Sequence, residues 1–63
     1  MTASLIARSL KSYRQREGLT QDALARRVGV VWVTISRWEN SRAVPQHYLL
    51  QRLQDMGILR AKG

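Results

Sequence analysis

Two short amphipathic segments joined at a glycine constrain the fold of this chain more than any other feature. The first, residues 20–28, opens with Thr20, a residue type that caps helices, and repeats its apolar residues four apart. The second, residues 31–40, follows Gly29 and repeats them at spacings of four and three. The repeating residues are Leu24 and Val28 in the first segment and Val31, Ile35 and Trp38 in the second. These spacings predict two short helices with a tight turn between them.

The turn and the crossing of these helices make specific demands on the sequence. Helices that cross steeply need a small residue where their backbones approach, and Ala25 stands at that place. A tight turn needs a residue that tolerates a positive φ, and Gly29 does so. The residues expected to close the small core between the helices are Leu24, Val28, Val30, Ile35 and Trp38. The combination predicts a helix-turn-helix motif.

Two further helices are predicted around this motif. Residues 3–16 form the first, with Thr2 or Ser4 as its N-cap, and residues 46–56 form the fourth, after Pro45. The inward residues are expected to be Leu5, Ile6, Leu10 and Tyr13 in the first helix, and Leu49, Leu50, Leu53 and Met56 in the fourth.

We therefore expect residues 1–63 to form a single compact all-α domain. Its helices are expected at residues 3–16, 20–28, 31–40 and 46–56, with a tail at residues 58–63. Four helices are favoured over five, because a fifth helix is not expected after Gly57.

The charge balance indicates a polyanionic partner. Eleven Lys and Arg against four Asp and Glu give a formal net charge of +7, which favours nucleic acid or an anionic membrane surface over mere solubility. The absence of cysteine excludes disulfides, and one lone histidine, His47, with scattered acids offers neither a catalytic constellation nor a metal site. We expect no enzyme, no cofactor and no small-molecule ligand. Without a membrane-spanning run or a signal-peptide pattern, a cytoplasmic protein is expected.

The segments LTQDALARRVGV and TISRWEN resemble the DNA-binding domain of the Cro and repressor (XRE-type) family of phage and bacterial regulators. The resemblance extends over most of the chain, and it implies a lambda-repressor-like fold that binds double-stranded DNA. It also implies a partly buried ion pair between Arg14 in the first helix and Glu39 at the end of the recognition helix. Gln21, by the same resemblance, contacts a phosphate and helps to orient the side chains of the next helix.

Function must lie on the outward face of the third predicted helix, because its inward residues only close the fold. At about 100° per residue, Val31 points inward together with Ile35 and Trp38, so Val30 and Val31 are expected in the core. The outward residues, between about 140° and 240° from Val31, are Val33, Ser36, Arg37 and Asn40. Trp32 and Thr34 lie on the two flanks of this face.

This face has the chemistry to read a major groove. Val33 can meet a thymine methyl group, and Arg37 can pair with guanine O6 and N7, or else hold a phosphate or remain solvated. The residues expected to contact bases are Trp32, Val33, Ser36 and Arg37. Those expected to contact phosphates are Gln21, Thr34, Asn40 and Arg42.

The start of the recognition helix departs from the family pattern. Relatives commonly carry Ser or Thr where Val31 stands, so this chain gives up a cap worth about 1 kcal/mol. They also commonly show polar amides in place of Trp32 and Val33. The Trp32 indole can lie over the sugar-phosphate wall, fold back as extra core, or serve a protein interface.

These features predict a Cro-like transcriptional repressor of phage, prophage or mobile-element origin. It is expected to bind a palindromic operator as a weak homodimer, through the fourth helix, the loop before it or the tail. In the tail, Ile58 and Leu59 either pack onto their own core or pair with a second copy. The alternative is a protein-interaction module of the same fold, an antirepressor or a complex subunit, which docks through Trp32 and Val33.

Overall fold

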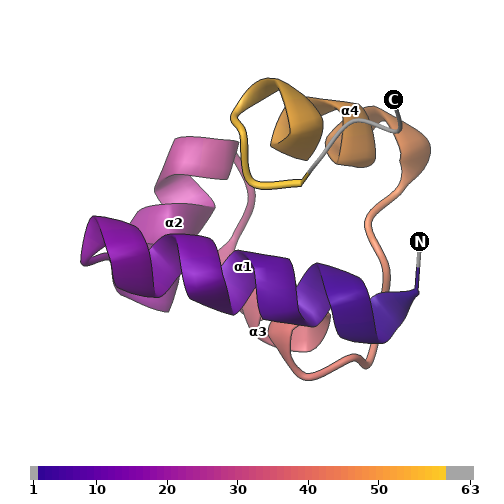
Figure 1. Cartoon of the computed structure of the whole chain (residues 1–63), viewed down its shortest axis with the longest axis horizontal. Coiled ribbons are helices and arrows are strands. Elements are labelled where there is room, and N and C mark those ends of the chain that lie inside the picture. The colour runs from indigo at the N-terminus through magenta and orange to yellow at the C-terminus, as the bar shows by residue number, and fades with distance from the viewer. Residues whose placement is uncertain (1, 60–63) are drawn as a thin grey trace.

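The computed structural model describes residues 2–59. In this part of the chain there are four helices and no strand: α1 (Ala3–Glu17), α2 (Gln21–Val28), α3 (Trp32–Glu39) and α4 (His47–Asp55) (Figure 1). The predicted all-α fold is confirmed, and each helix begins and ends within a residue of its predicted bounds.

Side-chain caps and a left-handed glycine set the ends of the first two helices. Thr2 Oγ1 accepts a hydrogen bond from Leu5 N at the start of α1, and Thr20 Oγ1 accepts one from Ala23 N at the start of α2. Gly29 ends α2 with φ of 94°, a conformation that costs residues with a Cβ atom but not glycine. The sharp turn into α3 therefore depends on Gly29.

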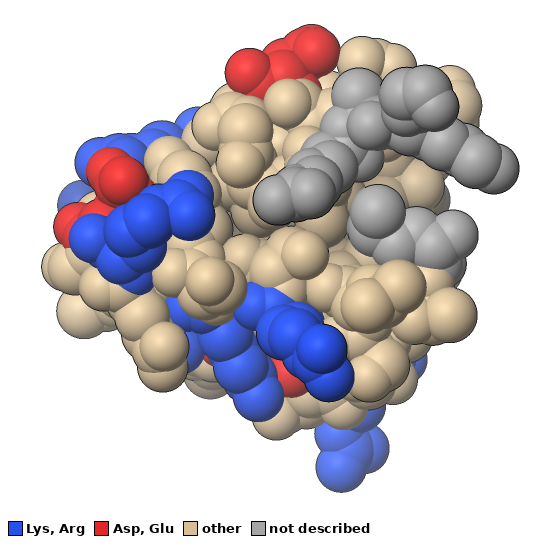
Figure 2. Space-filling view, viewed as in Figure 1, with Lys and Arg blue, Asp and Glu red and all other residues tan. Residues whose placement is uncertain are grey.

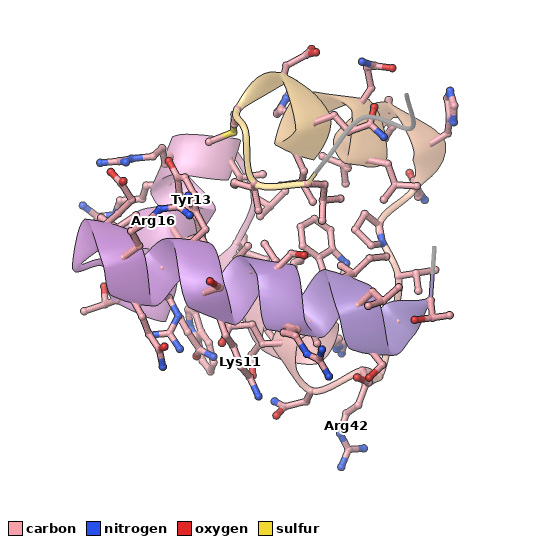
Figure 3. The ribbon with its side chains drawn as sticks, in the orientation of Figure 1. Lys11, Tyr13, Arg16 and Arg42 are labelled. Atoms are coloured by element: carbon pink, nitrogen blue, oxygen red, sulfur yellow. The ribbon has the colours of Figure 1, made fainter. Side chains whose placement is uncertain are left out.

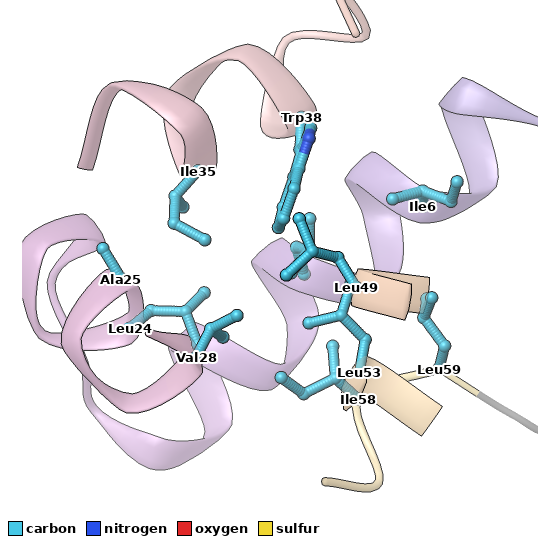
Figure 4. Packing of buried hydrophobic residues seen from close by; sticks show 11 residues of the cluster. Ile6, Leu24, Ala25, Val28, Ile35, Trp38, Leu49, Leu53, Ile58 and Leu59 are labelled. Carbon is cyan, nitrogen blue, oxygen red and sulfur yellow. The ribbon is translucent and has the colours of Figure 1, made fainter. Parts of the chain in front are cut away.

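The four helices enclose one apolar cluster (Figure 4). In Figure 1, α1 crosses the middle of the molecule, and α3 and α4 lie on opposite sides of it. Side chains from every helix point into the same centre, as Figure 4 shows. The cluster consists of Ile6, Leu10, Leu24, Ala25, Val28, Ile35, Trp38, Leu49, Leu53, Ile58 and Leu59. Tyr13, Val30, Leu50 and Met56 are partly buried against it.

Leu5 corrects one expectation about this core. It was predicted to face inward, but half of its surface is exposed. The buried residues of α1 are Ile6, Ala7 and Leu10, and Leu5 lies about 100° to the other side of Ile6, outside the face that they form. Ile6 takes the inward place, and Ala7 on its other side is also buried.

Val31 corrects a second expectation. It was predicted to lie in the core, but it is 64% exposed. Its backbone is extended, with φ of −82° and ψ of 155°, because Val31 is the N-cap of α3 and not its first helical residue. The rotation of about 100° per residue holds only within a helix, so it does not predict the direction of the Val31 side chain.

The segment after α4 packs onto the core of its own chain. Gly57 turns the backbone, and Ile58 and Leu59 are both buried in the apolar cluster. No fifth helix occurs up to residue 59. The rest of the predicted tail, residues 60–63, lies outside the described residues.

Candidate nucleic-acid interface

Three consecutive apolar residues lie exposed at the start of α3. Val31 is 64% exposed, Trp32 55% and Val33 39%. Val31 makes no side-chain hydrogen bond as N-cap, so the first turn of α3 keeps unsatisfied backbone N–H groups on its surface. This basic protein thus presents an apolar surface at the N-terminus of α3, where the free backbone N–H groups of that helix also point outward.

The second half of α3 presents polar and basic groups on its outer side. Asn40 Nδ2 donates to Ser36 O at 2.9 Å and to Ser36 Oγ at 3.3 Å. The structure thereby brings together two residues that the sequence assigned separately to phosphate and to base contacts. Arg37 lies beside them, exposed, and its guanidinium makes no hydrogen bond or ion pair to any residue from 2 to 59.

Arg42 extends this polar surface beyond the end of α3. Its backbone N–H donates to Arg37 O at 2.9 Å, which holds the loop against the last turn of α3. The exposed Arg42 side chain points away from α4, toward the edge of the molecule on which α3 lies (Figure 3). Like Arg37, it has no side-chain partner in the described part of the chain.

Arg14 and Glu39 form a bidentate ion pair beneath this surface. Arg14 Nε lies 2.9 Å from Glu39 Oε2, and Arg14 Nη2 lies 3.0 Å from Oε1. The Glu39 side chain is only 2% exposed and that of Arg14 is 23% exposed. The hydrogen bond to Glu39 raises the pKa of Arg14 above its ordinary value; burial lowers it, and the charge of Glu39 adds to the rise.

Gln21 completes this polar network from α2. Its Nε2 donates to Glu39 Oε1 at 3.1 Å, so one buried carboxylate connects α1, α2 and α3. No buried side-chain N or O atom in residues 2–59 lacks a hydrogen-bond partner. Since a buried charge is costly unless it is paired and hydrogen-bonded, the network fixes the end of α3 relative to the other two helices.

Thr34 lies apart from the other predicted contacts. It is partly buried and lines a shallow hollow of about 330 Å³ with Val30, Val44 and Tyr48, on the side of α3 that faces α4. It is therefore at a flank of the outward face, as the helical rotation predicted.

Arg52 is a structural contributor that the sequence reasoning missed. Its Nη1 donates to Val28 O at 2.8 Å and so satisfies a carbonyl at the end of α2, directly before the turn. A Cβ atom placed on Gly29 would lie 2.9 Å from the same Nη1. Nothing in the sequence signals this contact, because 24 residues separate the two partners.

The described residues contain no cluster of three or more His, Cys, Asp or Glu side chains suited to a metal ion. Within the same residues, no helix is long and apolar enough to cross a membrane.

Two helices joined at a left-handed glycine, the second with an exposed outer face, define a helix-turn-helix domain of the DNA-binding class. A family model described as a helix-turn-helix domain matches residues 5–56. The chain belongs to this family, in agreement with its resemblance to XRE-type regulators. Domains of this family typically serve DNA-binding regulators. Comparisons with curated proteins and with solved structures gave no match.

Proposed function

We propose that the chain is a sequence-specific regulator of transcription that reads the major groove of duplex DNA with α3. The observation that supports this most is the outward face of α3, where Val33, Arg37 and Asn40 are exposed and Glu39 is held by its ion pair with Arg14. The net charge of +7 favours a polyanion. By resemblance, the regulator is a Cro-like repressor of phage, prophage or mobile-element origin.

The base-contacting residues in this proposal are Trp32, Val33, Ser36 and Arg37. Val33 supplies methyl groups for a thymine methyl, and the exposed Arg37 guanidinium supplies two parallel donors for guanine. The Ser36 hydroxyl accepts from Asn40 and retains its own proton for donation. The half-exposed Trp32 ring lies beside these bases against the sugar-phosphate wall, where its indole N–H can donate to a phosphate.

The phosphate-contacting residues in this proposal are Gln21, Thr34, Asn40 and Arg42. Arg42 supports it best, since its exposed charge has no partner among residues 2–59. Gln21 and Asn40 each retain an amide oxygen or hydrogen beyond the bonds they make within the protein. Such contacts fix the register of α3 in the groove without reading sequence.

A weak homodimer on a palindromic operator is part of the same proposal. Ile58 and Leu59 are buried in their own core, which removes them as pairing residues. Val44 in the loop before α4 and Tyr48 in its first turn are 54% and 60% exposed. Exposed apolar residues so close together favour this loop and helix start as the dimer surface. On a duplex with two half-sites, Tyr48→Lys is expected to abolish cooperativity while a single half-site binds as before.

The competing function is a protein-interaction module, an antirepressor or complex subunit, that docks through Trp32 and Val33. The exposed apolar run that begins at Val31 favours it. Such a module needs no phosphate contacts, so its DNA binding would be absent or insensitive to sequence.

Selection from a pool of random-sequence duplexes tests the proposed function. A sequence-specific regulator is expected to enrich one motif, with two inverted halves spaced by about one helical turn, roughly 34 to 36 Å. Arg37→Gln is expected to relax the preference at one guanine position by about 1 to 3 kcal/mol. Arg26→Gln, on the outer side of α2, is the matched control and is expected to enrich the wild-type motif. Failure of the folded protein to enrich any motif contradicts sequence-specific regulation.

A further inference from the structure

The basic side chains of residues 2–59 divide into those with partners in this part of the chain and those without. Arg14 is paired with Glu39, Arg26 with Asp22 and Arg27 with Glu17. Arg52 is bonded to the carbonyl of Val28, and Arg16 lies 5.5 Å from the centre of the Tyr13 ring. Within residues 2–59, the cations whose side chains make no hydrogen bond, ion pair or contact with an aromatic ring are Arg8, Lys11, Arg37 and Arg42. Figure 2 shows one group of Lys and Arg at the left of this face, beside Asp and Glu, and a second group at the lower middle and bottom of the face.

Lys11 lies on the side of α1 that flanks α3. It stands three residues before Arg14, and side chains at that spacing are neighbours on one helix face. Arg14 reaches Glu39 at the last residue of α3, so the Lys11 side of α1 adjoins the end of α3. In Figure 3 the exposed side chains of Lys11 and Arg42 point toward the same edge of the molecule, away from α4.

We propose that Lys11 contacts a backbone phosphate of the duplex that α3 binds, so that α1 forms part of the DNA interface. The inference rests on the proposed function and adds an element outside the helix-turn-helix to it. Duplex DNA carries one negative charge per about 1.7 Å of its axis, so a duplex that meets Arg42 offers further phosphates along the same rim. A lysine ammonium on a flexible stem suits a phosphate as a point charge.

Arg16 provides a matched control on the same helix. It lies five residues after Lys11, on the side of α1 that faces Gly57 and Ile58, where it lines a groove with Tyr13. In Figure 3 Arg16 points to the opposite side of α1 from Lys11. Lys11→Gln and Arg16→Gln each remove one exposed positive charge and keep a good helix former, so any effect of net charge alone is equal in both.

The experiment measures the affinity of the whole chain for a labelled random-sequence duplex by fluorescence anisotropy at several salt concentrations. Lys11→Gln is expected to make the slope of log affinity against log salt shallower by about 0.9, the change for one lost phosphate contact. Arg16→Gln is expected to keep the wild-type slope, and Lys11→Arg to restore it. Thermal unfolding of each variant verifies that it is folded.

Two outcomes separate this inference from the proposed function. If wild-type protein binds with a steep salt dependence but Lys11→Gln and Arg16→Gln have the same slope, the Lys11 contact is wrong and DNA binding stands. If folded wild-type protein does not bind the duplex even at low salt, both proposals fail.

Discussion

Arg14 and Glu39, 25 residues apart in the sequence, meet through two parallel hydrogen bonds of 2.9 and 3.0 Å. The carboxylate is almost wholly buried, whereas the guanidinium keeps part of its surface in water. Gln21 binds the same carboxylate from α2. Glu39, at the end of α3, is therefore bonded to both α1 and α2, and these bonds fix the position of that end of the helix.

This unequal burial predicts unequal costs for the two halves of the pair. Arg14→Gln leaves the buried Glu39 charge without its partner and is expected to destabilise the protein by about 3 kcal/mol. Glu39→Gln leaves a guanidinium that water can still reach, so its cost is expected to be smaller. Urea unfolding of both variants measures the difference, and equal costs would contradict this account of the pair.

The same pair predicts a flat pH dependence. Because the hydrogen bond to Glu39 raises the pKa of Arg14 in the folded state, its contribution is fully present below the unfolded pKa and is lost only as pH rises through the folded value. Both values lie far above neutrality, so the stability difference between wild type and Arg14→Gln is expected to be the same at about pH 6 and about pH 9. If the stability difference between wild type and Arg14→Gln becomes smaller over this pH range, a group other than Arg14 determines its pH dependence.

Gly29→Ala tests the turn of the motif. The substitution places a side chain in a left-handed conformation, with a cost of about 1 to 2 kcal/mol, and crowds Arg52 Nη1 away from Val28 O. Gly18 at the end of α1 is also left-handed, but a Cβ atom there has no neighbour within 4 Å. Gly18→Ala therefore reports the backbone cost alone. Thermal unfolding is expected to rank Gly29→Ala as the more destabilising of the two.

Ser41 is the one residue other than glycine with a positive φ, 59°, in the described part of the chain. Ser41→Gly is expected to stabilise the protein by about 0.5 kcal/mol, because relief of the left-handed strain exceeds the entropy that glycine adds to the unfolded chain. The control is Ser12→Gly in the middle of α1, which is expected to destabilise. A loss of stability in Ser41→Gly would contradict the strain argument.

Val31 is a position at which the capping of α3 can be improved. Its backbone has the geometry of an N-cap, like that of Thr20, but its side chain makes no capping hydrogen bond. Val31→Ser is expected to stabilise α3 and raise the unfolding free energy by about 1 kcal/mol. Val33→Ser, inside the helix, cannot cap and is expected to give no such gain. Urea unfolding measures the gain. An unchanged unfolding midpoint for Val31→Ser would show that solvent already satisfies the N–H donors at the start of α3.

Much of the fold follows from local patterns in the sequence. The caps at Thr2 and Thr20 and the left-handed glycines mark helix ends by their own chemistry, so these ends were predicted within a residue. Leu5 and Val31 were misplaced because a repeat of three and four does not say where a helix begins or how wide its buried face is. Both are set by the packing of whole helices.

The candidate site also has a part that the sequence predicts and a part that depends on how the helices pack. The outward residues of α3 follow from helical rotation once the inward ones are known; Arg37 is exposed there and Ser36 is partly exposed. The position of Lys11 beside α3 and the bond from Arg52 to Val28 depend on how α1 and α4 pack against the motif. A periodicity within one helix carries no information about its neighbours, so these residues emerged only from the structure.

The most direct test of DNA binding by α3 uses the two tryptophans. Trp38 is buried and Trp32 is half exposed, so a change in emission on adding duplex DNA reports chiefly on Trp32 at the start of α3. In a titration with random-sequence duplex at low and at moderate salt, we expect an emission change that is lost in Trp32→Phe and an affinity that falls steeply with salt. Folded protein that shows no binding at low salt would contradict the account and favour a protein partner for Trp32 and Val33.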